Sequence, residues 1–163
     1  MRIAQGALSF HSVTPVIWRG NWAWGLPLIV LTVGIHVLGL GLMNQRAVRT
    51  FSQTTERRHP LAVFALVLGT TTLLATGLHA LEAGIWAASY QILGALPDYK
   101  SAMLYSMSAM TSYGHENLYL EGHWQLMGAI EALNGWLLFG LTTAFLFGMI
   151  ERVWLSSNRG GRR

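Results

Sequence analysis

Three long apolar stretches, separated by polar segments, organise the 163-residue chain. Residues 23–43 carry no charge, and a helix of that length, at about 1.5 Å per residue, crosses the roughly 30 Å of a bilayer core. A second apolar stretch covers residues 60–93, and a third covers residues 124–150. We therefore predict three transmembrane helices over these ranges, the second of them longer than a bilayer requires.

The segment between the second and third stretches is too short and too polar for another span, yet it differs from an ordinary loop. Pro97 and Asp98 supply a helix start, and residues 98–111 have the small and apolar composition of a short helix. Both ends of the segment face the same side of the membrane, which predicts a re-entrant loop. Non-helical backbone at membrane depth is tolerated only when protein buries it or when it lines a water-filled path.

Composition and charge agree with a membrane protein and set its orientation. Hydrophobic residues make up 52% of the chain and charged residues 11%, whereas soluble domains carry about 25% charged residues. The arginines gather in residues 44–59 and in the tail, residues 151–163, so both segments are predicted to be cytoplasmic and residues 1–22 extracytoplasmic. We expect a multi-pass protein of the cell (inner) membrane. The sequence has no basic stripe interleaved with aromatic residues, so it does not indicate nucleic-acid binding. It also has no cysteine, which excludes disulfides and thiolate metal sites.

The order of helix, re-entrant helix, glycine-containing segment and helix resembles the pore module of the potassium-channel family. The family's Asp-Leu-Tyr and following Trp are similar to Asn117, Leu118, Tyr119 and Trp124 at matching spacing. Residues 135–144 (Gly-Trp-Leu-Leu-Phe-Gly-Leu-Thr-Thr-Ala) are similar to the family's Gly-x-x-x-Phe-Gly-Leu-x-Thr-Ala stretch in the inner helix. The resemblance covers about residues 60–150, and the first helix is an addition.

This resemblance implies a homotetramer around a fourfold axis, with residues 60–93 as outer helix, 98–111 as pore helix and 124–150 as inner helix. Aligned without a gap, the family's filter Thr-Val-Gly-Tyr-Gly falls on Ser112, Tyr113, Gly114, His115 and Glu116, with Asn117 at the outer mouth. The pore lining and gate are expected at Trp136, Phe139, Thr143 and Phe147. The resemblance implies no cofactor, only permeant monovalent or divalent cations. The expected partners are other copies of the chain and membrane lipids.

The filter departs from the family at its outer end. Glu116 occupies the second glycine position, where a left-handed backbone costs a non-glycine residue roughly 1 to 2 kcal/mol. An alternative alignment makes Tyr113-Gly114 the family's Tyr-Gly pair and places His115 at its Asp position, with Trp124 out of register. In either alignment, four chains bring rings of His115 and Glu116 near the mouth, and acidic rings attract cations.

Ionisable residues inside membrane spans are functional candidates by default. We interpret one set as an intramembrane polar network in which a His-Glu pair of the second helix bonds to the third helix or the re-entrant helix: His79, Glu82, Glu131 and Asn134. His36 is read as a packing residue. Axial haem ligation by His36 and His79 is a further possibility, disfavoured because the topology places them in different halves of the bilayer.

The sequence thus predicts an all-α membrane protein with three transmembrane helices, a re-entrant pore helix and a filter loop, assembled as a homotetramer. Passive cation conduction is the expected function, with no catalytic residues, no bound metal and no enzymatic activity. The alternative is a non-conducting, pore-like membrane assembly or accessory subunit, which Glu116 at a glycine position favours. A haem-binding redox subunit is the third hypothesis.

Overall fold

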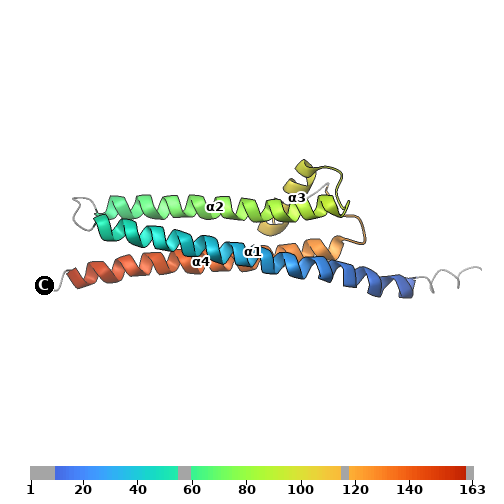
Figure 1. Ribbon diagram of the computed structural model, residues 1–163, viewed down its shortest axis with the longest axis horizontal. Coiled ribbons are helices and arrows are strands. Elements are labelled where there is room, and N and C mark those ends of the chain that lie inside the picture. Colours follow the sequence, from blue (N-terminus) through green and yellow to red (C-terminus); the bar gives the residue numbers. More distant parts are fainter. Residues whose placement is uncertain (1–9, 55–59, 115–117, 161–163) are drawn as a thin grey trace, which may run out of the picture. The chain divides into compact units, whose positions relative to one another are not determined.

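The protein is described by a computed structural model covering residues 10–54, 60–114 and 118–160, and each regular element in these ranges is an α-helix. The predicted all-α class is therefore confirmed. The described residues form three long helices and one short one, which are labelled in Figure 1. Their bounds are α1 Phe10–Thr54, α2 Pro60–Ile92, α3 Tyr99–Thr111 and α4 Gln125–Gly160.

The three long helices are long and apolar enough to cross a membrane. The segments that meet this description are Trp18–Arg49, Leu61–Ile92 and Gln125–Arg152. The first predicted span, residues 23–43, lies inside α1, which continues to Thr54 through much of the predicted loop of residues 44–59. Residues 44–53 contain no proline or glycine, so nothing in the local sequence ends the helix where the apolar residues end.

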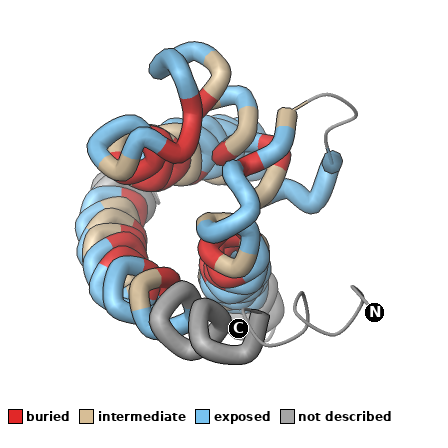
Figure 2. The backbone as a smooth tube through the Cα atoms, turned by 90° about the vertical axis from the view of Figure 1, so that its right-hand side faces the viewer, coloured by how far each residue is buried: buried red, intermediate tan, exposed pale blue. Residues whose placement is uncertain are grey.

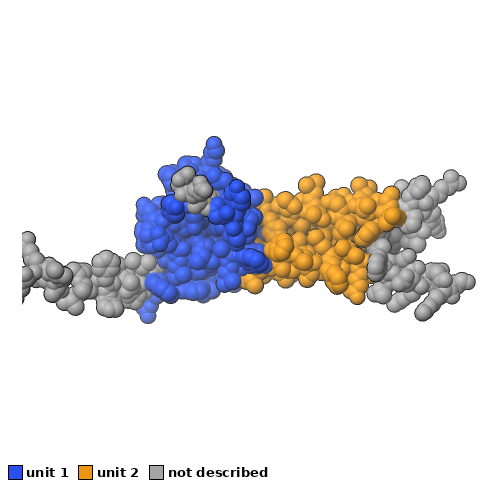
Figure 3. Space-filling model, turned by 180° about the vertical axis from the view of Figure 1, so that it is seen from behind, with its two compact units in different colours: residues 1–32, 82–136 blue, residues 33–81, 137–163 orange. Residues whose placement is uncertain are grey.

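The chain divides into two compact units (Figure 3). Each unit is built from parts of all three long helices. Unit 1 comprises residues 1–32 and 82–136, and unit 2 comprises residues 33–81 and 137–163. In both units the long helices bury some positions and expose others, as the alternation of red and pale blue along each helix shows (Figure 2). Many of the exposed positions are large and apolar, as expected for surfaces that meet lipid or other chains.

Unit 1 contains the main apolar core. Trp86 and Tyr90 of α2 and Met127 of α4 are fully buried there, and Leu28 of α1 packs into the same cluster. Gly25 of α1 is in close contact with the Ile130 side chain of α4. A Cβ added at Gly25 would lie 3.0 Å from the nearest methyl group of Ile130. The missing side chain at Gly25 therefore lets α1 and α4 approach each other closely.

In unit 2, a close contact at a glycine and a hydrogen bond hold the long helices together. A Cβ added to Gly39 of α1 would lie 2.6 Å from the Leu78 side chain of α2. Arg152 of α4 donates a hydrogen bond from Nη1 to Asn44 Oδ1 of α1 at 3.0 Å. α1 and α4 are thus also joined by a polar contact where the apolar residues of α4 give way to Arg152.

The short helix α3 begins where the sequence indicates, because Asp98 caps it. The Asp98 carboxylate accepts hydrogen bonds from the Ser101 backbone N–H at 2.9 Å and from the Ser101 hydroxyl at 2.7 Å. Both bonds lower the pKa of Asp98 from its ordinary value of 3.8, and the bond from the Ser101 backbone has the larger effect. The cap satisfies backbone donors that the first turn of a helix leaves without a partner.

Replacing Asp98 by Ala is expected to loosen the first turn of α3, whereas Asp98→Asn retains an acceptor and should preserve it. Hydrogen exchange of the α3 amides measures the effect. The pKa of Asp98 is lower in the folded chain than in the unfolded chain. The ionised carboxylate therefore stabilises the fold at neutral pH, and this stabilisation is lost as the pH falls through the folded pKa, below 3.8. Equal α3 protection in the wild type and Asp98→Ala would show that the cap has no role.

Candidate functional site

The end of α3 has the backbone geometry of a helix C-cap with a left-handed residue. Ser112 follows the helix in the left-handed conformation with φ 55°, and Gly114 adopts φ 81° two residues later. The Ser112 N–H donates to the Ala109 carbonyl at 3.1 Å, and the Tyr113 N–H donates to the Ser108 carbonyl at 3.0 Å. Among the described residues other than glycine, Ser112 is the one with positive φ, a left-handed conformation that commonly ends a helix.

Close contact between α3 and α4 places this turn. Gly135 of α4 lies directly against the backbone of Met110, and Gly128, two turns earlier on α4, lies beside the Tyr105 hydroxyl. Trp136 of α4 then donates a hydrogen bond from Nε1 to the Ser112 hydroxyl at 2.9 Å. The structure thus brings together one predicted filter residue, Ser112, and one predicted pore-lining residue, Trp136.

The remaining predicted filter residues are exposed or lie outside the described residues. The Tyr113 side chain is 86% exposed, and a Cβ at Gly114 would meet open space. His115, Glu116 and Asn117 lie outside the described residues, so their predicted roles stay predictions. An open groove of about 430 Å³ runs beside this segment and is lined by α3, the turn after it and small residues of α4, among them Gly128 and Ala132.

The other predicted pore-lining residues lie on exposed positions of α4. Phe139 is 62% exposed and Phe147 66% exposed. Thr143 is also exposed, and its hydroxyl donates to the Phe139 carbonyl of its own helix at 2.9 Å. This row of side chains is therefore available to lipid, to another chain or to a pore.

Glu131 of α4 is fully buried in unit 1 and has a specific partner. The Tyr90 hydroxyl of α2 donates to Glu131 Oε2 at 2.7 Å, and the Tyr105 ring of α3 packs edge-on against the Tyr90 ring with centroids 5.5 Å apart. A buried carboxyl group without hydrogen bonds is costly, so this pair holds α2 against α4 directly beneath α3. Asn134, one turn further on, donates to the Thr32 hydroxyl of α1 at 2.8 Å.

Replacing Tyr90 by Phe should lower the free energy of unfolding by roughly 1 to 3 kcal/mol, because the buried Glu131 carboxyl loses its donor. Thermal unfolding in detergent measures the loss, with Tyr113→Phe as an exposed control. Glu131→Gln combined with Tyr90→Phe should cost less than the sum of the two single changes, since both remove one interaction. Strict additivity would show that the two residues act independently.

In unit 2, His36 and His79 share one hydroxyl group. His36 Nε2 lies 2.9 Å and His79 Nε2 lies 3.1 Å from Thr142 Oγ1, and the two ring centroids are 5.0 Å apart. The two rings are therefore close neighbours, although the sequence predicted them in different halves of the bilayer. Each lies just past the middle of its candidate span, and because Cα–Cβ bonds tilt toward the helix N-terminus, side chains of antiparallel helices lean toward each other.

The shared hydroxyl also bears on the haem hypothesis. Axial ligation needs the iron between the two Nε2 atoms, with the flat macrocycle between the rings. The two ring centroids are only 5.0 Å apart and both nitrogens bond to Thr142 of α4, so the flat macrocycle has no space between the rings. Unit 2 therefore gives no support to a haem held by His36 and His79.

No known family model, curated protein or solved structure matches the chain. The residues themselves are therefore the basis for a functional inference. The described hydrogen bonds give the members of the predicted polar network different partners: Tyr90 for Glu131, Thr32 for Asn134 and Thr142 for His79. Each of these three bonds joins α4 to α1 or α2.

Sequence reasoning missed several polar residues that hold the helices. Asn21 of α1 donates to the His123 carbonyl at 2.7 Å and accepts from the Met127 N–H at 2.9 Å, which joins α1 to the start of α4. Thr32, Tyr90 and Thr142 each bond to a predicted site residue. These residues are single polar positions within apolar stretches, which is how the sequence could have identified them. Polar groups away from water need hydrogen-bond partners.

Proposed function

We propose that the chain is one subunit of a homotetrameric channel that conducts cations passively. Residues 112–116 form the filter, α3 is the pore helix and α4 lines the path. The observation that carries the proposal is the docking of a 13-residue helix on α4 through Gly135, followed at once by left-handed backbone at Ser112 and Gly114. Left-handed residues orient carbonyl groups in ways that continuous helix or strand does not allow, as a carbonyl-lined filter requires.

The electrostatics of α3 support the same role. The C-terminal end of a helix carries a partial negative charge, and that end of α3 leads directly into the proposed filter. Tyr99–Thr111 contains a single charged residue, Lys100, which lies at its other end. A cation near Ser112 would therefore be stabilised by the helix end and by backbone carbonyls without any acidic side chain of α3.

Assembly around an axis would explain the exposed apolar positions. Trp136, Phe139 and Phe147 on α4 and Tyr113 after α3 are 62 to 86% exposed in the single chain. Because one chain would hold one re-entrant element, several copies would be needed to surround a path. In the proposed topology the N-terminus lies outside and the arginine-rich residues 44–59 and 151–163 are cytoplasmic in the cell membrane.

Purified protein in liposomes tests the proposal. We expect flux of potassium, sodium or calcium above that of empty liposomes, together with a tetramer by native mass spectrometry. A tetramer without flux of any cation would favour the alternative, a non-conducting assembly or accessory subunit, which Glu116 at a glycine position of the family motif supports. A monomer without flux would contradict both.

A further inference from the structure

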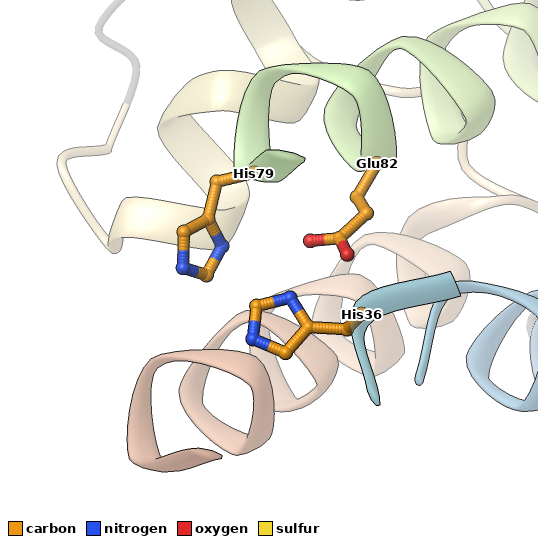
Figure 4. A group of neighbouring side chains, drawn as sticks. All are labelled: His36, His79 and Glu82. Carbon is orange, nitrogen blue, oxygen red and sulfur yellow. The ribbon is translucent and has the colours of Figure 1, made fainter. Parts of the chain in front are cut away.

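His36 and His79 in unit 2 form a pair whose ring nitrogens converge on one point. Both Nε2 atoms are within 3.1 Å of Thr142 Oγ1, and the His36 ring is fully buried. The two residues offer ligand nitrogens within 4.8 Å of each other. Figure 4 shows the two rings facing each other from α1 and α2. Two nitrogens that point at a common position are the first requirement of a chelating site.

The hydroxyl group of Thr142 limits the hydrogen placement on the two histidines. A threonine hydroxyl has one hydrogen to donate, so it donates to at most one Nε2 and accepts from the other, or it accepts from both. At least one Nε2 therefore carries a hydrogen in the hydrogen-bonded state. A cation bound by both Nε2 atoms would need a lone pair from each, so its binding would move that hydrogen off Nε2.

A carboxylate follows on the same helix as His79. Glu82 lies three residues after His79 in α2, and residues three apart on a helix project from neighbouring positions of one face. Helical metal proteins present a carboxylate and an imidazole from one helix at this spacing in the order Glu-x-x-His, and this helix has the two residues in the reverse order. Glu82 would also supply the negative charge that a cation needs in a low-dielectric interior.

We propose that His36 and His79 bind a transition-metal dication of the zinc class, with Glu82 as the carboxylate partner on α2. Imidazole nitrogen together with carboxylate oxygen suits Zn²⁺ and disfavours Mg²⁺ and Ca²⁺, which take all-oxygen sites. Zinc–nitrogen distances of about 2.0 to 2.1 Å require the two nitrogens to draw closer together than in the hydrogen-bonded state, while Thr142 releases one or both bonds. The bound ion would tie α1 to α2.

Zinc binding to the purified full-length chain in detergent tests this proposal, with an affinity tag that contains no histidine. We expect about one zinc per chain after loading with zinc chloride and desalting, and a rise in the midpoint of thermal unfolding. Cobalt(II) in place of zinc should give the visible absorption of a four-coordinate site. Magnesium chloride at the same concentration should produce no shift of the midpoint.

Three ligand variants and two controls locate the ion. His36→Gln, His79→Gln and Glu82→Gln should each weaken zinc binding by at least about tenfold. His123→Gln, in a loop of unit 1 with its side chain 47% exposed, should bind like the wild type. Thr142→Val removes the shared hydrogen bonds and leaves both imidazoles, so it should retain the metal.

Two results would overturn the proposal. One is a wild-type chain that retains no zinc and shows no thermal shift. The other is stoichiometric binding that survives in both histidine variants, which would place the ion elsewhere. Should a histidine variant fail to fold, the cobalt spectrum of the wild type and the Thr142→Val variant still decide. These readouts are independent of cation flux, so the metal site and the channel proposal can fail separately.

Discussion

A single methyl group added at Gly135 is expected to abolish cation flux and to lower stability, although alanine is the better helix former. The Cβ of an alanine would overlap the backbone of Met110 in α3, and a backbone cannot move aside as a flexible side chain does. Overpacking of this kind costs typically 1 to 3 kcal/mol and displaces the segments in contact. The displaced segment here is the end of α3, which places Ser112 and the proposed filter.

Gly140→Ala is the matched control on the same helix. Nothing lies within 4 Å of the position its Cβ would take, so the change should be neutral or stabilise the chain by up to about 1 kcal/mol through helix propensity. Thermal unfolding of both variants in detergent and liposome flux measure the contrast. The docking of α3 on α4 would be refuted if Gly135→Ala matched Gly140→Ala in both measurements.

Gly114→Ala is expected to reduce cation flux by roughly 5- to 30-fold. Gly114 has φ 81°, a backbone conformation that costs an alanine about 1 to 2 kcal/mol, and this energy corresponds to such a factor in the population of the conducting conformation. No neighbouring atom of the described residues lies within 4 Å of the added Cβ, so the expected effect is one of backbone conformation and not of collision.

Gly94 is a control that also has a positive φ but lies outside the proposed filter. It has φ 64°, and its added Cβ also meets open space, so Gly94→Ala carries a similar conformational cost in the turn after α2. We expect both variants to lose similar stability, with flux reduced mainly in Gly114→Ala. Equal flux losses in the two variants would indicate general destabilisation and would remove the special role of Gly114.

Several features of this protein followed from local sequence alone. Long apolar stretches predict three helices that can cross a membrane, where a helix satisfies its own backbone hydrogen bonds. The short helix was also predictable: residues 98–111 were expected, and α3 is Tyr99–Thr111 with Asp98 as its cap. Caps and breaks depend on neighbours within a turn, so they can be read from consecutive residues.

The helix ends were less predictable where charge and helix propensity disagree. The loss of apolar character after residue 43 indicated a loop, yet α1 continues to Thr54. Apolarity reports the membrane boundary, whereas the helix boundary depends on proline, glycine and capping groups.

Partners between helices were decided by the tertiary structure. Sequence alone identified Glu131 and His79 as polar residues that need partners, but not Tyr90 or Thr142 as those partners. Which side chains meet depends on where glycines such as Gly25, Gly39 and Gly135 let helices approach, and on how each helix is turned about its axis. A periodic apolar pattern sets neither quantity, since most faces of these helices are apolar. For that reason the sequence determined the helices of this protein, while only the packed chain placed His36 beside His79 and Ser112 beside Trp136.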